Sequence, residues 1–140
     1  MYELVYCSLA KRSLNENDIL DILNTAKAFN SKNGITGCLL YYKNEFIQIL
    51  EGEKKAVKEL YKNIQHDSRH SAVTLMIDDE LEDRKFNDWS MAYYELNNQH
   101  MDELGNSIFV ENFMALSNLA RQTTLTVKLF WKMAKLLIEK

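Results

Sequence analysis

The chain has 140 residues, of which 46% are hydrophobic and 26% are charged, and its formal net charge is −3 at pH 7. This length fits one domain with its own core, and this composition excludes an intrinsically disordered chain. Lys and Arg are scattered among acidic residues, so we expect no basic face of the kind that binds nucleic acid. No apolar run approaches the roughly 20 residues of a membrane span, and the N-terminus does not resemble a signal peptide, so we expect a cytoplasmic protein.

The first element that the sequence predicts is a strand from Tyr2 to Leu9. Tyr6 lies on one face of this strand and Cys7 on the other. Cys7 and the second cysteine, Cys38, both fall in apolar runs without a CxxC spacing or a nearby His. We therefore expect both cysteines in the core, and we predict neither a metal site nor a disulfide.

A helix is predicted after this strand. Ser13 followed three residues later by Glu16 has the spacing of a capping box, which begins a helix. Apolar residues then recur at helical spacing as far as Phe29. Gly34 predicts the end of the helix, because glycine readily adopts the left-handed conformation of a C-terminal cap. Asn30 therefore falls in the last turn.

Residues 35–42 and 45–50 predict a β-hairpin joined by Lys43-Asn44. Side chains alternate in the second strand, so Gln48 lies on the same face as Phe46 and is expected to be buried. A buried amide without partners costs about 1–3 kcal/mol, so partners for Gln48 are required. Two explanations remain open: a neighbouring strand or core tyrosine satisfies the amide, or a ligand with its own donors and acceptors does so.

The remaining elements follow in a regular order. Residues 57–64 predict a second amphipathic helix, and a polar cluster follows it at residues 66–70. Residues 72–77 predict a fourth strand, residues 78–85 a solvated loop, and residues 89–94 a fifth strand.

This order predicts an α+β fold of the ferredoxin-like type, βαββαββ, with a mixed five-stranded sheet and two helices on one face. We expect residues 1–96 to form this domain and residues 97–140 to add a C-terminal helical extension within the same compact unit. The last helix carries one apolar stripe from Leu125 to Ile138 and a second stripe that contains Val127, Trp131 and Leu136. Two stripes exceed what one docking surface needs, so we expect part of this surface to meet a partner.

Three polar side chains are expected to converge in this fold. The first and third strands lie side by side at the centre of a ferredoxin-like sheet, which makes Tyr6 and Gln48 neighbours on the helix-covered face. Asn30 reaches the same space from the end of the first helix. A phenol and two amides around an apolar slot suit a flat heteroaromatic ligand, because each offers directional hydrogen bonds to ring edges.

The segments that carry these residues resemble the BLUF domain, a blue-light sensor that uses flavin. Five segments match in order and spacing, and together they are highly specific. They are Val5-Tyr6-Cys7-Ser8-Leu9, Ala28-Phe29-Asn30 with Gly34-Ile35-Thr36-Gly37, Phe46-Ile47-Gln48-Ile49-Leu50-Glu51-Gly52, Ile64-Gln65-His66-Asp67-Ser68-Arg69-His70, and Phe86-Asn87-Asp88-Trp89-Ser90-Met91.

The resemblance implies a photoreceptor, not an enzyme, with a flavin held non-covalently between the two helices. FAD is the expected flavin, and FMN is the alternative. The ring would lie near Tyr6, Gln48 and Asn30, with Gln48 bridging the Tyr6 hydroxyl and the flavin edge. Light would move an electron and a proton from Tyr6 through Gln48 to the excited flavin. Their return would leave Gln48 rotated or tautomerised.

Further positions follow from the same resemblance. Arg69, His70 and Asp67 match the segment that meets the ribityl and phosphate groups of the flavin, and Arg suits phosphate by its charge and fork geometry. A solvated loop is the alternative for His70 and Asp67. Trp89 and Met91 match the switch positions on the fifth strand, and their alternative is a place in the core.

The output is expected to be a contact with another protein. The chain resembles a short, stand-alone BLUF protein that signals from the fifth strand through the C-terminal helices to an unidentified protein partner, and we expect a homo-oligomer. The alternative function is a flavin-free ferredoxin-like interaction module, in which Tyr6 and Gln48 bond only to each other. A third possibility, an acylphosphatase-like hydrolase, lacks a phosphate-cradling loop and a nucleophile paired with a base.

Overall fold

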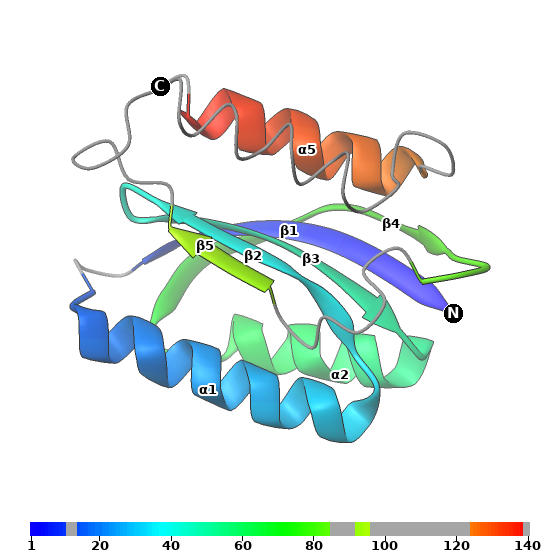
Figure 1. Ribbon diagram of the computed structural model, residues 1–140, viewed down its shortest axis with the longest axis horizontal. Coiled ribbons are helices and arrows are strands. Elements are labelled where there is room, and N and C mark those ends of the chain that lie inside the picture. Colours follow the sequence, from blue (N-terminus) through cyan, green and yellow to red (C-terminus); the bar gives the residue numbers. More distant parts are fainter. Residues whose placement is uncertain (11–13, 85–91, 96–123, 139–140) are drawn as a thin grey trace.

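A computed structural model describes residues 1–10, 14–84, 92–95 and 124–138 of the chain. Within these ranges a β-sheet is covered by α1 and α2 on one face and by α5 on the other (Figure 1). The elements are β1 (Tyr2–Ala10), α1 (Glu16–Asn33), β2 (Thr36–Tyr42), β3 (Glu45–Gly52), α2 (Lys54–Gln65), β4 (His70–Glu80), β5 (Ala92–Glu95) and α5 (Leu125–Ile138).

The strands lie in the order β4-β1-β3-β2-β5. β1 pairs antiparallel with both β3 and β4, β3 pairs antiparallel with β2, and β5 runs parallel to β2. The predicted α+β fold of the ferredoxin-like type is therefore confirmed. The β1–β3 register sets Tyr6 opposite Gln48, as expected from the placement of these two strands at the centre.

The β2–β3 hairpin has the predicted connection. Lys43 and Asn44 both have positive φ angles, 46° and 68°, which is the twist that a two-residue hairpin turn requires. Further along the hairpin, Gly37 allows the two strands to approach closely. A Cβ atom at this position would lie 2.0 Å from the carbonyl oxygen of Ile49, so only glycine fits.

Helix α1 begins at a different cap from the one predicted. Its N-cap is Asn15, whose side chain accepts a 2.8 Å bond from the Asp18 amide, while the Asp18 carboxylate accepts a 3.1 Å bond from the Asn15 amide. The predicted box of Ser13 and Glu16 is therefore wrong, because Asn and Asp fill the same two roles two residues later. The predicted end is confirmed: Gly34 has φ 66° and caps the helix.

Strand β4 is longer than predicted. The predicted loop from residue 78 is wrong at its start, because Asp78, Asp79 and Glu80 continue the strand and pair with β1. These charges are tolerated because β4 is an edge strand whose side chains are largely exposed, and edge charges discourage pairing with other chains. The predicted fifth strand overlaps β5, but Trp89 and Met91 lie outside the described residues.

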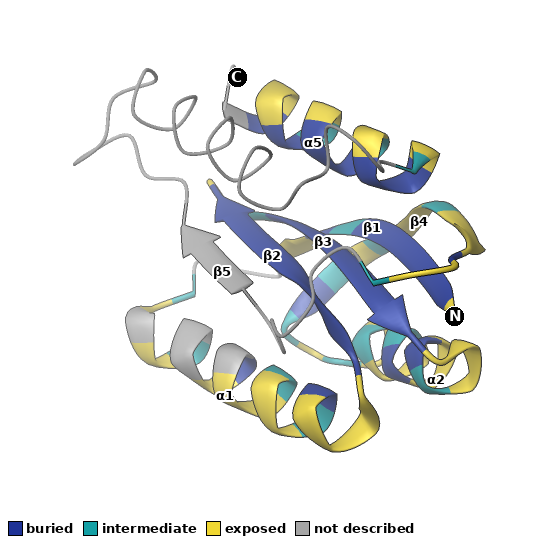
Figure 2. Cartoon of the chain, turned by 45° about the vertical axis from the view of Figure 1, so that its right-hand side comes forward, coloured by how far each residue is buried: buried dark blue, intermediate teal, exposed yellow. Residues whose placement is uncertain are grey.

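Alternation along the strands divides the apolar residues into two cores, one on each face of the sheet. Figure 2 shows the central strands buried between α5 on one side and α1 and α2 on the other. The helix-pair core, under α1 and α2, contains Tyr2, Leu4, Tyr6, Ile22, Ile35, Leu39, Tyr41, Phe46, Leu50, Val57 and Leu60. The α5 core contains Val5, Cys38, Leu40, Tyr42, Ile47, Ile49, Val127, Phe130, Trp131, Ala134 and Leu137.

The docking face of helix α5 was predicted incorrectly, because its residues were divided between two apolar stripes. Val127 and Trp131 were assigned to a second stripe, yet both are buried against the sheet together with Phe130. Spacings of three and four residues bring these positions onto one helical face. Leu125 and Leu136 are the exposed apolar residues of α5, at 69% and 53%. The described helices are all too short or too polar to span a membrane.

Both cysteines pack in or against the α5 core, as predicted. Both are free thiols. Cys38 is buried within the α5 core, and its burial raises the pKa of the thiol well above the usual value. Cys7 is half-buried and packs against the same core.

Candidate functional site

Tyr6 and Gln48 form a buried polar pair at the centre of the sheet. The Tyr6 hydroxyl donates a hydrogen bond to Oε1 of Gln48, and the two residues are only 1% and 3% exposed. The two side chains share a face because they lie directly opposite each other in the β1–β3 register, and this face packs against α1 and α2. Burial raises the pKa of the Tyr6 phenol well above its usual value, so this group keeps its proton at neutral pH.

A cavity of about 140 Å³ opens beside this pair, between the two helices and the central strands. Its wall is mostly apolar, with polar groups from β1, β3 and the segment after α2. The lining residues are Tyr6, Ile22, Thr25, Ala26, Phe29, Leu39, Gln48, Leu60, Asn63, Ile64, Asp67, Arg69 and His70. An apolar slot with a few directional polar groups is the usual form of a small-molecule site.

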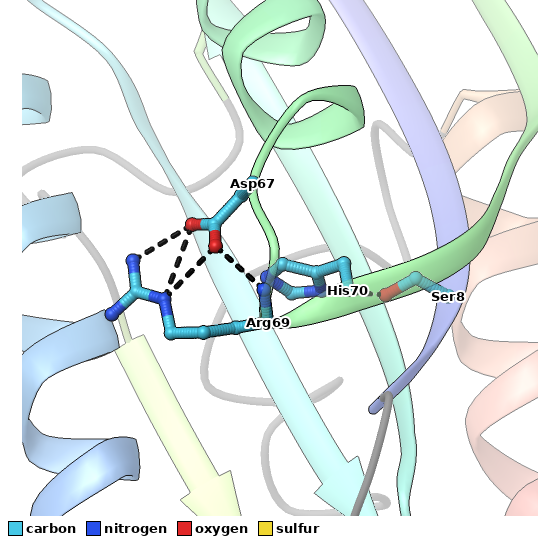
Figure 3. A network of polar contacts seen from close by, with 4 residues as sticks. All are labelled: Ser8, Asp67, Arg69 and His70. Carbon is cyan, nitrogen blue, oxygen red and sulfur yellow. Dashed lines mark hydrogen bonds and ion pairs between the residues drawn. The ribbon is translucent and has the colours of Figure 1, made fainter.

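The segment between α2 and β4 supplies the charged part of this wall (Figure 3). Nη2 of Arg69 lies 2.7 Å from Oδ2 of Asp67, and Nε of Arg69 lies 3.0 Å from Oδ1. The backbone amide of Arg69 donates to the same carboxylate at 2.9 Å. These bonds lower the pKa of Asp67 and raise the pKa of Arg69, so both groups stay charged. The carboxylate therefore holds the guanidinium in the wall of the cavity.

His70 closes the wall where β4 begins. It is 6% exposed, and its Nδ1 lies 2.9 Å from the Ser8 hydroxyl (Figure 3). Its ring centroid also lies 4.8 Å from that of Phe46. Burial lowers the pKa of His70, although Asp67 opposes this effect, so the ring is neutral at pH 7. His70 and Asp67 both line the cavity, which a solvated loop, the alternative for these two residues, does not explain.

The other predicted site residues are not brought to this cavity by the described structure. Asn30 is fully buried in the last turn of α1, where its carbonyl oxygen accepts bonds from the amides of Gly34 and Ile35. It is not among the residues that line the cavity, so its role at a ring edge stays a prediction. Trp89 and Met91 lie outside the described residues.

Sequence reasoning missed several neighbours of the site. Ser8 had a signal, since alternation places it on the same face as Tyr6. Tyr61 of α2 lies beside Tyr6 with ring centroids 5.6 Å apart, and Thr25 and Asn63 reach the cavity from the two helices. No local pattern identifies these three residues, because their position depends on how α1 and α2 cross the sheet.

A larger cavity of about 420 Å³ lies on the opposite face, between the strands and α5. Its lining is mainly apolar and includes Cys7, Leu9, Met133 and Leu136. We assign the site to the smaller cavity, because only there do a phenol, an amide and an arginine converge. Among the described residues, no group of three His, Cys, Asp or Glu side chains is arranged to hold a metal ion.

Comparison with known proteins identifies relatives of this chain. A family model described as sensors of blue-light using FAD (BLUF) matches residues 1–92. The photoactivated adenylate cyclase subunit beta of Euglena gracilis is 38% identical over 90 residues, which are 64% of this chain and 10% of that protein. The chain therefore spans about a tenth of the length of this relative.

Solved structures match over nearly the whole chain. The dark-state structure of BlrB, a BLUF protein, has a TM-score of 0.70 at 26% identity and covers 97% of this chain and 96% of that one. The structure of Klebsiella pneumoniae BlrP1 with FMN and cyclic diGMP has a TM-score of 0.73 at 26% identity and covers 99% of this chain and 34% of that one.

Proposed function

Because the chain belongs to the BLUF family of blue-light sensors that use FAD, we propose that its light-sensing switch is the buried pair of Tyr6 and Gln48. The observation that carries this proposal is the hydrogen bond from the Tyr6 hydroxyl to the Gln48 amide at the edge of a cavity between α1 and α2. The donor set fits a flavin, because Tyr6 is oxidisable and Gln48 has both a donor and an acceptor end.

A bound flavin supplies the absorption of blue light and, once excited, the ability to take an electron. Tyr6 would donate one electron and its hydroxyl proton to that flavin, and Gln48 would relay the proton because its amide lies against the phenol oxygen. The electron and the proton would then return to Tyr6. No bond is broken in the net process, and what remains is a changed hydrogen-bond pattern.

The proposed change in hydrogen bonding is a change in the side-chain amide of Gln48. Its amide oxygen faces Tyr6 in the present structure. In the other state the amide is rotated or tautomerised, so that the group facing Tyr6 and the group facing the flavin exchange their donor and acceptor roles. Both states satisfy the buried amide, which is why the pair can hold either one.

Arg69 is the proposed partner of the flavin's phosphate and ribityl groups. It is a cation in the wall of the cavity, and Asp67 holds it in position. His70 is neutral there and suits a hydroxyl or carbonyl partner. We propose FAD as the bound flavin, with FMN as an accepted alternative. Titration of the flavin-free protein with each of the two, followed by flavin fluorescence, measures the preference.

The proposed output passes through the opposite face of the sheet to a protein partner. Ile47 and Ile49 flank Gln48 on β3 and pack in the α5 core. A change at Gln48 is therefore one residue away from contacts that hold α5. We propose that residues 97–140 form the output extension, that β5 contributes to the path, and that the chain acts as a homo-oligomer. The net charge of −3 favours a protein partner over nucleic acid.

Illumination of the purified, flavin-loaded protein tests the proposal. Blue light should shift the flavin absorption band reversibly to the red, and Gln48→Leu should abolish the shift while flavin remains bound. Asn63→Leu is the matched control and should keep the shift, because Asn63 lines the same cavity but takes no part in the Tyr6–Gln48 hydrogen bond. Failure of the purified protein to bind added flavin would instead support the alternative function, a flavin-free interaction module.

A further inference from the structure

A row of polar side chains crosses the sheet on the face that α5 covers. In register, Glu3 of β1 lies between Asp79 of β4 and Glu51 of β3, and Glu51 lies opposite Thr36 of β2. Each of these positions is two residues from a residue that packs on the α5 side, so all four share that face. The row therefore holds three neighbouring carboxyl groups.

Two of these carboxyl groups are completely buried. Glu3 and Glu51 are both 0% exposed, and they face each other directly across the β1–β3 pair. Like charges at directly opposite positions destabilise a sheet, and an isolated buried charge is costlier still. One proton between the two groups removes this repulsion.

The surroundings distinguish the two carboxyl groups. Oε1 of Glu51 accepts a 2.7 Å bond from the Thr36 hydroxyl, which accepts a 2.9 Å bond from Nη1 of Arg84. Glu51 is therefore linked to a cation through one hydroxyl. Neither Glu3 oxygen has a partner with full hydrogen-bond geometry among the described residues. This asymmetry makes Glu3 the group that carries the proton.

The start of α5 lies over Glu3. The hydroxyls of Thr124 and Thr126 are close enough to favour the charged form of Glu3, and the partial positive charge of a helix N-terminus acts in the same direction. Burial outweighs the hydroxyls, and Glu51 and Asp79 add to its effect, so the pKa of Glu3 is raised. The first turn of α5 contains no acidic residue.

We propose that Glu3 is a proton-dependent latch for α5: protonated Glu3 lets the N-terminal turns of α5 lie over the carboxyl row, and loss of this proton loosens them from the sheet. The charged groups that act on the latch are Glu51 from β3, Asp79 from β4 and Arg84 through Thr36. The latch is independent of the proposed photochemistry, since no residue of the flavin site takes part in it.

The direction of the pH dependence follows from linkage. When α5 lifts, Glu3 meets water and its pKa returns toward the ordinary value of 4.5. The docked state has the higher pKa and binds more protons, so docking has its full stability below pH 4.5. This stability is lost as the pH rises through the raised pKa. Within that window, each pH unit increases the open fraction of α5 about tenfold.

Hydrogen exchange of the full chain in the dark tests the latch. Protection of the amides of residues 124–138 is measured from about pH 5 to about pH 8 and corrected for the intrinsic exchange rate. The wild-type open fraction should rise with pH, by up to about tenfold per unit. Glu3→Gln mimics the protonated group and should make the corrected protection independent of pH. Glu82→Gln, an exposed carboxylate outside the row, should keep the wild-type slope.

A second variant, Asp79→Asn, tests the latch even if Glu3→Gln does not fold. Asp79 is exposed, and Asp79→Asn removes one charge that raises the pKa of Glu3, so the total loss of protection should be smaller than in the wild type. The proposal is overturned if Glu3→Gln retains the wild-type slope, or if wild-type protection stays constant or increases with pH. If Glu3→Gln does not fold, an Asp79→Asn profile identical to the wild type overturns it.

Discussion

The two faces of the sheet use the same strands for different purposes. On the helix-pair face, β1 and β3 present Tyr6 and Gln48 to a cavity with an ion pair in its wall. On the α5 face, the alternate residues of these strands pack against Trp131 and its neighbours, and a mainly apolar cavity lies beside Met133 and Leu136. The cavity beside α1 and α2 is lined by a phenol, an amide and an ion pair, whereas the cavity beside α5 is mainly apolar.

This difference shows how a sheet can connect a sensor to an output. Gln48 and Ile49 are consecutive residues, yet their side chains lie in different cores. A tightly packed core transmits small displacements, because its side chains have few alternative positions. The polar face can therefore hold two states while the apolar face responds to them.

The largest expected effect is on the helix-pair face. Tyr6→Phe removes the hydroxyl that donates to Gln48 and leaves the ring in place. The variant should bind flavin and show no light-induced red shift, because the hydroxyl of the proposed electron and proton donor is gone. The light-minus-dark absorption spectrum measures this result.

Tyr61→Phe is the matched control for that prediction. Tyr61 contacts the Tyr6 ring at a centroid distance of 5.6 Å, and it loses the same hydroxyl group in the variant. It should retain the red shift. A Tyr6→Phe protein that shifts like the wild type would remove Tyr6 from the switch, while leaving the flavin site and the fold unaffected.

The second prediction concerns the α5 face. Trp131 is 1% exposed and packs edge-on against Phe130 at 4.9 Å, so Trp131→Ala should lower the free energy of unfolding by about 3–5 kcal/mol. Leu136→Ala, at a position 53% exposed, should lower it by only about 0.5 kcal/mol. Urea unfolding of the flavin-free proteins measures both values.

The same pair of variants tests how independent the faces are. Flavin affinity should be equal in folded Trp131→Ala and wild-type protein, because no residue of the α5 core lines the cavity proposed to bind flavin. A large loss of flavin affinity in Trp131→Ala, measured at urea concentrations well below its unfolding midpoint, would show that the two faces of the sheet are not independent.

The third prediction tests a backbone contact that both faces share. Gly37→Ala places a Cβ atom 2.0 Å from the carbonyl oxygen of Ile49, so β2 and β3 must move apart. We expect a loss of about 3 kcal/mol in the free energy of unfolding, as for other substitutions that strain a special backbone position. Because the strain is in the sheet itself, urea unfolding should show the loss with and without flavin.

Much of the fold was predictable because it depends on local patterns. Alternation along β1 and β3 identified the shared face of Tyr6 and Gln48, and Gly34 identified the end of α1. The errors also have local causes. Asn15 and Asp18 compete with Ser13 and Glu16 for the same capping roles, and sequence alone does not rank the two boxes.

The parts that could not be predicted depend on tertiary packing. The acidic end of β4 has the composition of a loop, and it is a strand because β1 offers unpaired backbone groups beside it. The docking face of α5 depends on which rotation of the helix fills the α5 core. The contact of Tyr61 with Tyr6 and that of Ser8 with His70 depend on how distant elements meet across the sheet, so no local pattern predicts either contact.

The smallest expected effect comes from the ion pair at the cavity wall. Arg69 lowers the pKa of Asp67 below its ordinary value of 3.8, so the pair adds stability above that pH and loses it as the pH falls through the lowered pKa. The two side chains are 23% and 31% exposed, and solvent limits the contribution to about 0.5–1 kcal/mol. The free energies of unfolding of wild type and Asp67→Asn, measured in urea, should therefore differ by this amount at neutral pH and converge in strong acid. Asp83 is exposed and serves as the control: Asp83→Asn should have the wild-type free energy of unfolding at neutral pH. A difference between wild type and Asp67→Asn that persisted in strong acid would mean that Asp67 stabilises the wall by packing and not by its charge.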